Sequence, residues 1–205
     1  METNFKISSE GEPILLSDLS GFIIDQVDPL VIPEDISYGR QPDGSDTWMF
    51  FSEPTPSESN VTQGANAFCD FPEFSINGGV YSSAVEVVIT TSLTDYPMFY
   101  TLDGSDPTIN SLIYDSPVVI GQTKVLRAAI ISSDCISNEI TTKTYLINEE
   151  SNLPTVSLVT DPYNLFDEEY GIYVLGNNYE NWNPFFGANF WQDWERPIHI
   201  EFFEP

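Results

Sequence analysis

Two acidic turns carry oxygen ligands of the kind that a hard cation prefers. Residues 43–46 and 103–106 both read Asp-Gly-Ser-Asp. Calcium takes carboxylate and carbonyl oxygens, so Asp103 and Asp106 are candidate ligands of a weak calcium site. An EF-hand loop would need more oxygens at alternate positions and a terminal Glu. Turn chemistry alone also explains the motif, because Asp-Gly supplies a positive φ and a side chain that bonds its own backbone.

Cys69 and Cys135 are the only cysteines of the chain. Two thiols and one distant histidine are too few ligands for a structural zinc site. A disulfide between them fits an exported protein, and two buried free thiols are the alternative that spacing leaves open. A bridge would close a loop of about 65 residues and contribute on the order of 4 kcal/mol through loop entropy.

The last fifty residues are rich in aromatic side chains that could stack on sugar rings. The candidates are Tyr179, Trp182, Trp191 and Trp194. Such a cluster is more often part of a core, or of a face that another part of the protein covers. Sugar stacking is therefore one hypothesis for this segment, beside burial in a core or an interface.

The sequence contains no complete active site. His199, the only histidine, alternates with Ile198 and Ile200 as in a strand, and no nucleophile elbow accompanies it, so we expect a structural or surface histidine. A kinase would need a phosphate-binding loop and catalytic and metal-binding Asp residues, which are not visible, and no lysine follows Lys143. With 32 acidic residues, a chance carboxylate pair says little about glycoside hydrolysis. We expect no catalytic residue, no enzyme activity and no cofactor other than calcium.

The charge balance excludes several partners. The chain has 6 basic and 32 acidic residues and a net charge of −26. Nucleic acid and anionic membrane surfaces are disfavoured, because both need a basic footprint. No apolar run approaches the roughly 18 residues of a membrane span. The N-terminus lacks a signal-peptide pattern. Either the protein is cytoplasmic or the chain begins inside a longer reading frame.

Short apolar stretches between turn residues predict a mainly β protein with an Ig-like antiparallel β-sandwich over residues 61–148. The strand candidates there are Glu73–Ile76, Val85–Thr91, Met98–Leu102, Val118–Ile120, Val125–Ser132 and Ile140–Ile147. Turns are expected at Asn77–Gly79 and at Thr94–Asp95.

The flanking segments are expected to be less complete. Residues 1–60 predict a partial β-sandwich that closes with a linker at Glu53–Asn60; its strand candidates are Glu12–Leu16, Gly21–Val27 and Thr47–Phe51. Residues 149–205 predict an incomplete, aromatic-rich α+β segment. Its expected elements are a strand at Leu153–Thr160, a turn or helix at Asn164–Asp167, and strands at Gly171–Val174 and Pro197–Phe203.

The middle segment carries a specific motif. Residues 99–108 read Phe-Tyr-Thr-Leu-Asp-Gly-Ser-Asp-Pro-Thr, and Tyr114, Pro117 and Val125–Ala128 follow. This pattern resembles the small β-sandwich at the C-terminus of chitobiase and β-hexosaminidase, which also occurs as a repeat in bacterial surface proteins. The resemblance implies a non-catalytic module.

The two flanks resemble other families. Ser37–Gly44, with Phe5–Glu12, Ile23–Val27 and Trp48, is similar to the C-terminal half of a bacterial lamin-tail domain. The C-terminal segment looks like the beginning of a CotH kinase-like domain; its matches are Leu153–Leu158, Thr160–Pro162, Gly171–Val174 and Trp194–Phe203. That family implies ATP, a divalent metal and transfer to protein hydroxyls, none of which maps onto this chain.

Together these resemblances imply part of an exported bacterial surface protein, secreted or at the cell surface, whose sandwiches space and present a downstream CotH-like domain. The expected partners are that domain and, beyond the parent protein, a glycan or a cell-surface protein. Two alternatives stay open: a carbohydrate-binding accessory module of a glycan-processing enzyme, and the N-terminal part of a CotH-type protein kinase.

Overall fold

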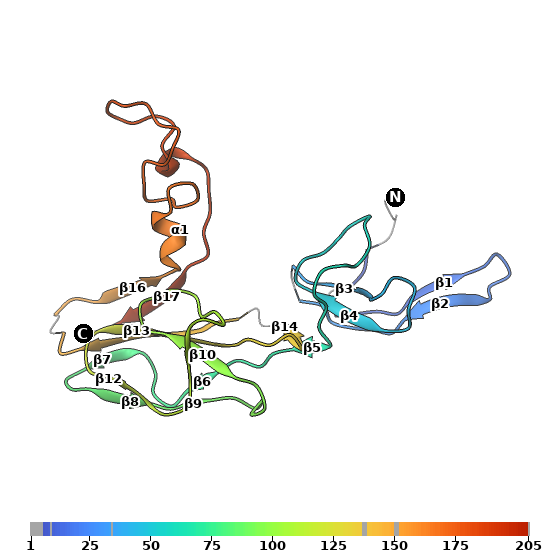
Figure 1. Cartoon of the computed structure of the whole chain (residues 1–205), viewed down its shortest axis with the longest axis horizontal. Coiled ribbons are helices and arrows are strands. Elements are labelled where there is room, and N and C mark those ends of the chain that lie inside the picture. The colour runs from blue at the N-terminus through green and yellow to red at the C-terminus, as the bar shows by residue number, and fades with distance from the viewer. Residues whose placement is uncertain (1–5, 9, 34, 137–138, 150–151, 205) are drawn as a thin grey trace. The chain divides into compact units, whose positions relative to one another are not determined.

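Figure 1 shows the computed structural model of the chain, which describes residues 6–8, 10–33, 35–136, 139–149 and 152–204. The chain divides into two compact units, Met1–Ala67 and Phe68–Pro205. Regular structure in the described residues is mainly β, with several antiparallel sheets, which confirms the predicted fold class. No helix in this part of the chain is long and apolar enough to cross a membrane.

The first unit contains two antiparallel hairpins, β1–β2 and β3–β4. Their strands are β1 (Ile14–Ser17), β2 (Ile23–Val27), β3 (Ser37–Arg40) and β4 (Trp48–Phe51). Asp18 closes the first hairpin, because its carboxylate accepts the backbone N–H groups of Ser20 and Phe22. The apolar side chains of β1 are exposed to solvent. A hairpin that buries so little of its apolar surface is what a partial sandwich would contain.

The segment predicted as a linker is bonded to the second hairpin. The Asn60 side-chain amide donates to the Arg40 carbonyl at 2.8 Å, and Gln41 Nε2 donates to the carbonyls of Asn60 and Thr62 at 2.9 and 2.8 Å. Proline and serine predict a flexible connector. This composition does not predict that amide side chains will bond backbone groups about twenty residues away.

The second unit contains most of the strands. They are β6 (Glu73–Phe74), β7 (Gly79–Tyr81), β8 (Val85–Val87), β9 (Ile89–Thr90), β10 (Met98–Thr101), β11 (Leu112–Ile113), β12 (Val118–Ile120), β13 (Lys124–Ile130), β14 (Cys135–Ile136), β15 (Thr141–Ile147), β16 (Thr155–Val159) and β17 (His199–Phe203). The short β5 (Ala67–Phe68) lies at the boundary of the two units.

The middle of the chain forms a two-layered β-sandwich. One layer is a five-stranded sheet in the order β11-β10-β13-β15-β7, antiparallel except for the β15–β7 pair. The other layer is built from the pairs β12–β8 and β6–β9. Their inward side chains meet in one core, which contains Val87, Ile89, Val118, Ile120, Leu126, Ala128, Tyr145 and Ile147. Alternating apolar residues in facing strands thus bury their side chains between the layers.

Several strand boundaries differ from the sequence prediction. The run predicted as one strand at Val85–Thr91 is divided at Val88, whose backbone N–H donates to the Ser75 hydroxyl. Gly79–Tyr81 was expected to begin in a turn and instead forms β7 alongside β15. The two-residue strands β11 and β14 were not predicted, because two residues show no periodicity.

The C-terminal segment contains the antiparallel pair β16–β17 and, between them, a short helix and irregular chain (Figure 1). Helix α1 (Pro162–Phe166) begins at Asp161, whose carboxylate accepts the Tyr163 N–H at 2.8 Å. A 3₁₀ turn covers Asn189–Trp191. The strand predicted at Gly171–Val174 does not form. The Gly171 N–H instead donates to the Asp167 carbonyl at 2.8 Å, which continues a turn.

Candidate functional site

The second acidic turn, which follows β10, is held by an arginine from the neighbouring strand of the same sheet. Arg127 lies in β13 with a side chain only 10% exposed. Its Nη1 donates to the Asp106 carboxylate and to the Gly104 carbonyl, and its Nε donates to Thr142 Oγ1 at 3.2 Å. The buried guanidinium thus closes the turn onto the sheet.

The two calcium candidates therefore have protein partners. Asp103 Oδ1 accepts the Ser105 hydroxyl at 2.5 Å and the Ser105 N–H at 3.1 Å, and these bonds lower the pKa of the Asp103 carboxyl. Asp106 binds Arg127. Among the described residues, no group of three or more His, Cys, Asp or Glu side chains could hold a metal ion. This geometry favours the turn-chemistry interpretation, and a calcium site here stays a prediction.

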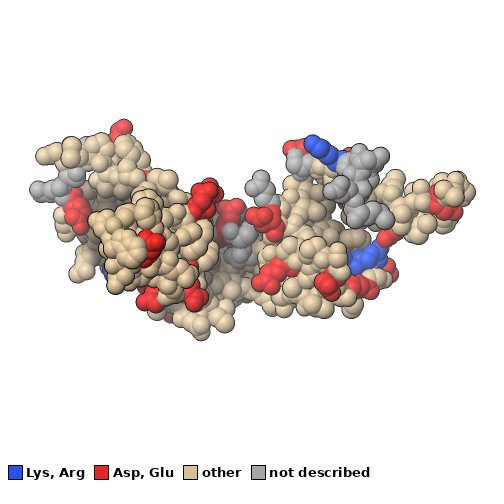
Figure 2. Space-filling model, turned by 90° about the horizontal axis from the view of Figure 1, so that it is seen from above, with Lys and Arg blue, Asp and Glu red and all other residues tan. Residues whose placement is uncertain are grey.

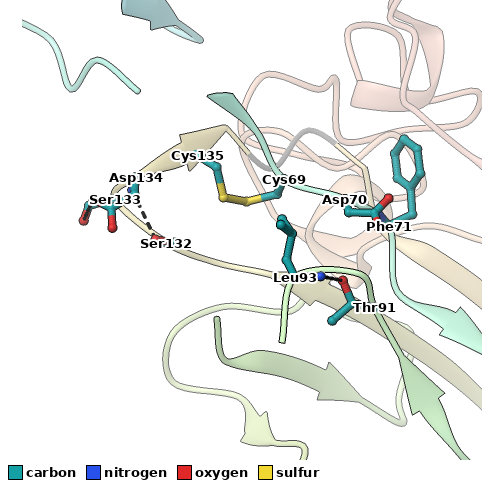
Figure 3. The surroundings of a disulfide bond; sticks show 9 residues. All are labelled: Cys69, Asp70, Phe71, Thr91, Leu93, Ser132, Ser133, Asp134 and Cys135. Carbon is teal, nitrogen blue, oxygen red and sulfur yellow. Dashed lines mark hydrogen bonds between the residues drawn. A yellow bond between two sulfur atoms is a disulfide. The ribbon is translucent and has the colours of Figure 1, made fainter. Parts of the chain in front are cut away.

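Cys69 and Cys135 form a disulfide that closes a 66-residue loop (Figure 3). Both cysteines are buried and belong to a small cluster with Ile130, against which Leu93 packs. The Cys69 N–H donates to the Ile136 carbonyl at 2.9 Å. The bridge thus fastens the first residues of the second unit to β14.

The four candidate aromatic residues are exposed. The exposed fractions are 36% for Tyr179, 64% for Trp182, 53% for Trp191 and 40% for Trp194. Trp191 contacts Phe186 and Phe190 and donates its indole N–H to the Pro184 carbonyl at 2.9 Å. These contacts hold the Trp191 ring in place without burying it. A core role does not fit such exposure, whereas sugar stacking and an interface do.

The β16–β17 ribbon has two chemically different faces. Val156 opposes Phe202 and Leu158 opposes Ile200, and these four side chains are 54–62% exposed. The opposite face, which lies against the sandwich, carries the polar residues Thr155, Ser157, His199 and Glu201 together with the buried Val159 and the half-buried Phe203. An amphipathic ribbon normally turns its apolar face toward the core. Here the face that packs is the one that contains the polar residues, beside Val159 and Phe203.

Glu201 is the centre of the polar contact between ribbon and sandwich. Its side chain is 9% exposed, and its Oε2 accepts the Thr144 N–H of β15 at 2.6 Å. Lys143 Nζ lies 3.7 Å from Oε1 and His199 Nε2 lies 3.9 Å from Oε2. A second bond joins the hydroxyls of Thr144 and Ser157 at 2.7 Å. The packed face is thus held by hydrogen bonds to a charged group.

A cavity of about 360 Å³ lies where the sandwich meets the C-terminal segment. Polar groups of both parts line it: Asp106, Arg127, Glu139, Thr142, Asp161 and Asn164. The Asp106 N–H donates to Asp161 Oδ2 at 2.7 Å, which links the acidic turn to the start of α1. Among these residues, only Asp106 was predicted from the sequence to bind a ligand. The others lie up to 58 residues away along the chain, and no local pattern joins them.

His199 lines the same cavity from the start of β17. Among the described residues, its Nε2 is the buried side-chain atom that has no hydrogen-bond partner. The side chain as a whole is 37% exposed. The sequence predicted a structural or surface histidine, and the residue stands at the edge of a polar cavity.

Acidic side chains dominate the charge of the surface. On the face drawn in Figure 2, Asp and Glu are scattered among uncharged residues, and Lys and Arg are few. No basic patch is seen on this face.

Residues 76–143 match the family model of the chitobiase/beta-hexosaminidase C-terminal domain. The match covers most of the sandwich and confirms the resemblance for this segment. It is an accessory, non-catalytic type of domain. No curated protein and no solved structure matches the chain.

Proposed function

We propose that this chain is a non-catalytic accessory part of an exported bacterial surface protein, in which the sandwich spaces and presents a neighbouring CotH-like domain. The resemblance of the C-terminal segment to the start of a CotH kinase-like domain supports the identity of that partner. The lamin-tail resemblance of the first unit and the disulfide support an exported protein. The matched accessory domain supports a role without catalysis.

One observation carries this proposal: the β16–β17 ribbon faces outward with its apolar side. Four large side chains, Val156, Leu158, Ile200 and Phe202, form a continuous exposed patch on paired positions. Leaving such side chains in water forgoes roughly 1.5–3 kcal/mol each relative to burial. A ribbon fixed to a sandwich by its polar face is therefore suited to support a further layer of polypeptide.

Sequencing the gene beyond the Pro205 codon tests the proposal directly. We expect the reading frame to continue into a CotH-like domain. In the longer protein, hydrogen exchange at Ile200 and Phe202 should be slower than in the 205-residue chain, because the added layer covers the ribbon. A following sequence of another kind, or unchanged exchange, would contradict the proposal.

The second candidate function is carbohydrate binding through the exposed aromatic residues. The family matched by residues 76–143 is named for two glycan-processing enzymes, chitobiase and beta-hexosaminidase, and the side chains of Trp182 and Trp191 are exposed. Aromatic faces stack on the C–H groups of sugar rings. We expect binding of the chain on a glycan array, and expect Trp182→Ala or Trp191→Ala to abolish it. Phe71→Ala, also an exposed aromatic residue, is the matched control. If glycan binding survives both tryptophan substitutions, the binding site lies elsewhere in the chain.

A further inference from the structure

We propose that the cavity between the sandwich and the C-terminal segment binds a small polyhydroxylated ligand that is not an anion, the class of sugars and amino sugars. Its walls come from the acidic turn, β13, the start of β15, and the chain around α1 and β17. The site is separate from the aromatic residues of the candidate stacking surface and from the exposed face of the ribbon. It needs no partner domain and goes beyond the function proposed above.

The size and composition of the cavity fit a single sugar ring. Its volume of about 360 Å³ lies at the lower end of the range for small-molecule sites. Apolar side chains line part of the wall: Ile140, Val159, Pro197 and Ile198. A pyranose has apolar C–H faces as well as hydroxyl groups, so a wall of mixed character suits it.

Hydrogen-bonding groups are left over on the cavity wall. Arg127 uses Nε and Nη1 for contacts to Thr142, Gly104 and Asp106, so its Nη2 has no bonded partner among the described residues. The Nε2 of His199 also has no hydrogen-bond partner among the described residues. A buried polar group without a partner, such as His199 Nε2, is unfavourable, and a ligand that bonds to it removes that cost. A hydroxyl-bearing ligand supplies both acceptors and donors.

The charges on the wall select against anions. Asp106, Glu139 and Asp161 contribute three carboxylates and Arg127 one guanidinium, and Asp106 is already paired with Arg127. Glu139 is exposed, and its carboxylate can accept a hydrogen bond from a hydroxyl or an ammonium group. A carboxylated or phosphorylated ligand would meet an excess of negative charge. Carboxylate acceptors beside a guanidinium donor favour ligands that can both donate and accept.

The proposal can be tested with three sugars that share one ring and differ in charge: glucose, glucosamine and glucuronate. Each is titrated into the full chain, labelled with ¹⁵N, and the backbone amide signals are followed by NMR. We expect glucose and glucosamine to shift the signals of Thr142, Asn164 and His199, and glucuronate to leave them unchanged. Glu139→Gln should weaken glucosamine binding about tenfold, the loss of one charged hydrogen bond. Glu86→Gln, on an exposed position of β8, is the matched control.

The outcomes separate this site from the aromatic surface. If Trp182→Ala leaves the shifts at Thr142, Asn164 and His199 intact, the cavity is the site. If none of the three sugars shifts these signals, or if glucuronate shifts them as strongly as glucose, the proposal is wrong. It is equally wrong if Trp182→Ala removes the shifts and Glu139→Gln does not.

Discussion

At the scale of single residues, the contact between Gly78 and Glu201 decides how the C-terminal segment sits on the sandwich. A Cβ at Gly78 would lie 2.6 Å from Glu201 Oε1 and 2.9 Å from the Thr144 carbonyl oxygen. Only a residue without a side chain allows the carboxylate to reach the Thr144 N–H. Glycine is needed here for close approach, not for its backbone dihedrals.

We predict that Gly78→Ala destabilises the second unit by about 1–3 kcal/mol, the usual cost of forcing an atom into a packed contact. Urea unfolding measures the change. Gly121→Ala is the matched control, because a Cβ there would lie 3.9 Å from the Ala84 Cβ, an ordinary contact. Equal stability of the two variants would show that Glu201 does not need the space at Gly78.

Asp103 gives a prediction about pH. Its bonds to the Ser105 hydroxyl and N–H lower the carboxyl pKa in the folded state below that in the unfolded state. The resulting stability is fully present above the unfolded pKa, about 3.9, and is lost as pH falls through the folded value. Asp103→Asn should therefore be less stable than the native chain at about pH 6, with the difference shrinking below about pH 4. A difference that stays constant over this range, measured by urea unfolding, would contradict this assignment.

At the scale of elements, strands with alternating side chains were predicted well from the sequence, but the breaks within them were not. The β-branched and aromatic runs that form β10, β12, β13 and β15 were predicted near their observed positions. The break at Val88 depends on the Ser75 hydroxyl thirteen residues away. The missing strand at Gly171–Val174 depends on backbone bonds to the preceding turn: Ile172 N–H to the Asn164 carbonyl and Tyr173 N–H to the Leu165 carbonyl. The local propensities of these residues predict neither the side-chain bond nor the backbone bonds.

The outward face of the β16–β17 ribbon can be tested by substitution. We predict that Ile200→Thr with Phe202→Thr changes the unfolding free energy by less than about 0.5 kcal/mol, because both side chains are already in solvent and Thr suits a strand. Fluorescence of a dye that binds apolar surface should fall in the same variant.

Val87→Thr is the comparison variant, since Val87 is fully buried. It should cost about 1–3 kcal/mol, the penalty for placing a hydroxyl without a partner in a core. A loss of similar size in the ribbon variant would show that Ile200 and Phe202 are covered in solution.

At the scale of the whole molecule, the disulfide joins the beginning of the second unit to a strand beyond most of the sandwich. Replacing both Cys69 and Cys135 by Ala should lower the stability of the second unit by about 2–4 kcal/mol, because the unfolded chain regains the freedom of a 66-residue loop. Thermal unfolding of the native and double-alanine chains measures the loss. Mass spectrometry with and without reductant gives the independent check. A mass of two free thiols in the untreated protein would refute the pairing.

The sequence allowed the fold to be predicted far better than the cavity. The motif at residues 99–108 was sufficient to identify the sandwich, because local turn chemistry and alternation are written in consecutive residues. The cavity brings together Arg127, Glu139 and Asn164, which sit in a strand, an irregular stretch and a helix. Each looks like an ordinary polar residue in its own neighbourhood. Only the docking of the C-terminal segment through Glu201 places them around one space.

The same carboxylate also determines which side of the ribbon meets the solvent. Side chains alternate along a strand, so sliding β17 by a single residue would bring Ile200 or Phe202 onto the sandwich and carry Glu201 into water. Such a slip would also leave the Thr144 N–H without its acceptor. The contact between Glu201 and Gly78 therefore fixes the register of β17. It leaves the apolar side chains of Ile200 and Phe202 exposed and available to a docking partner.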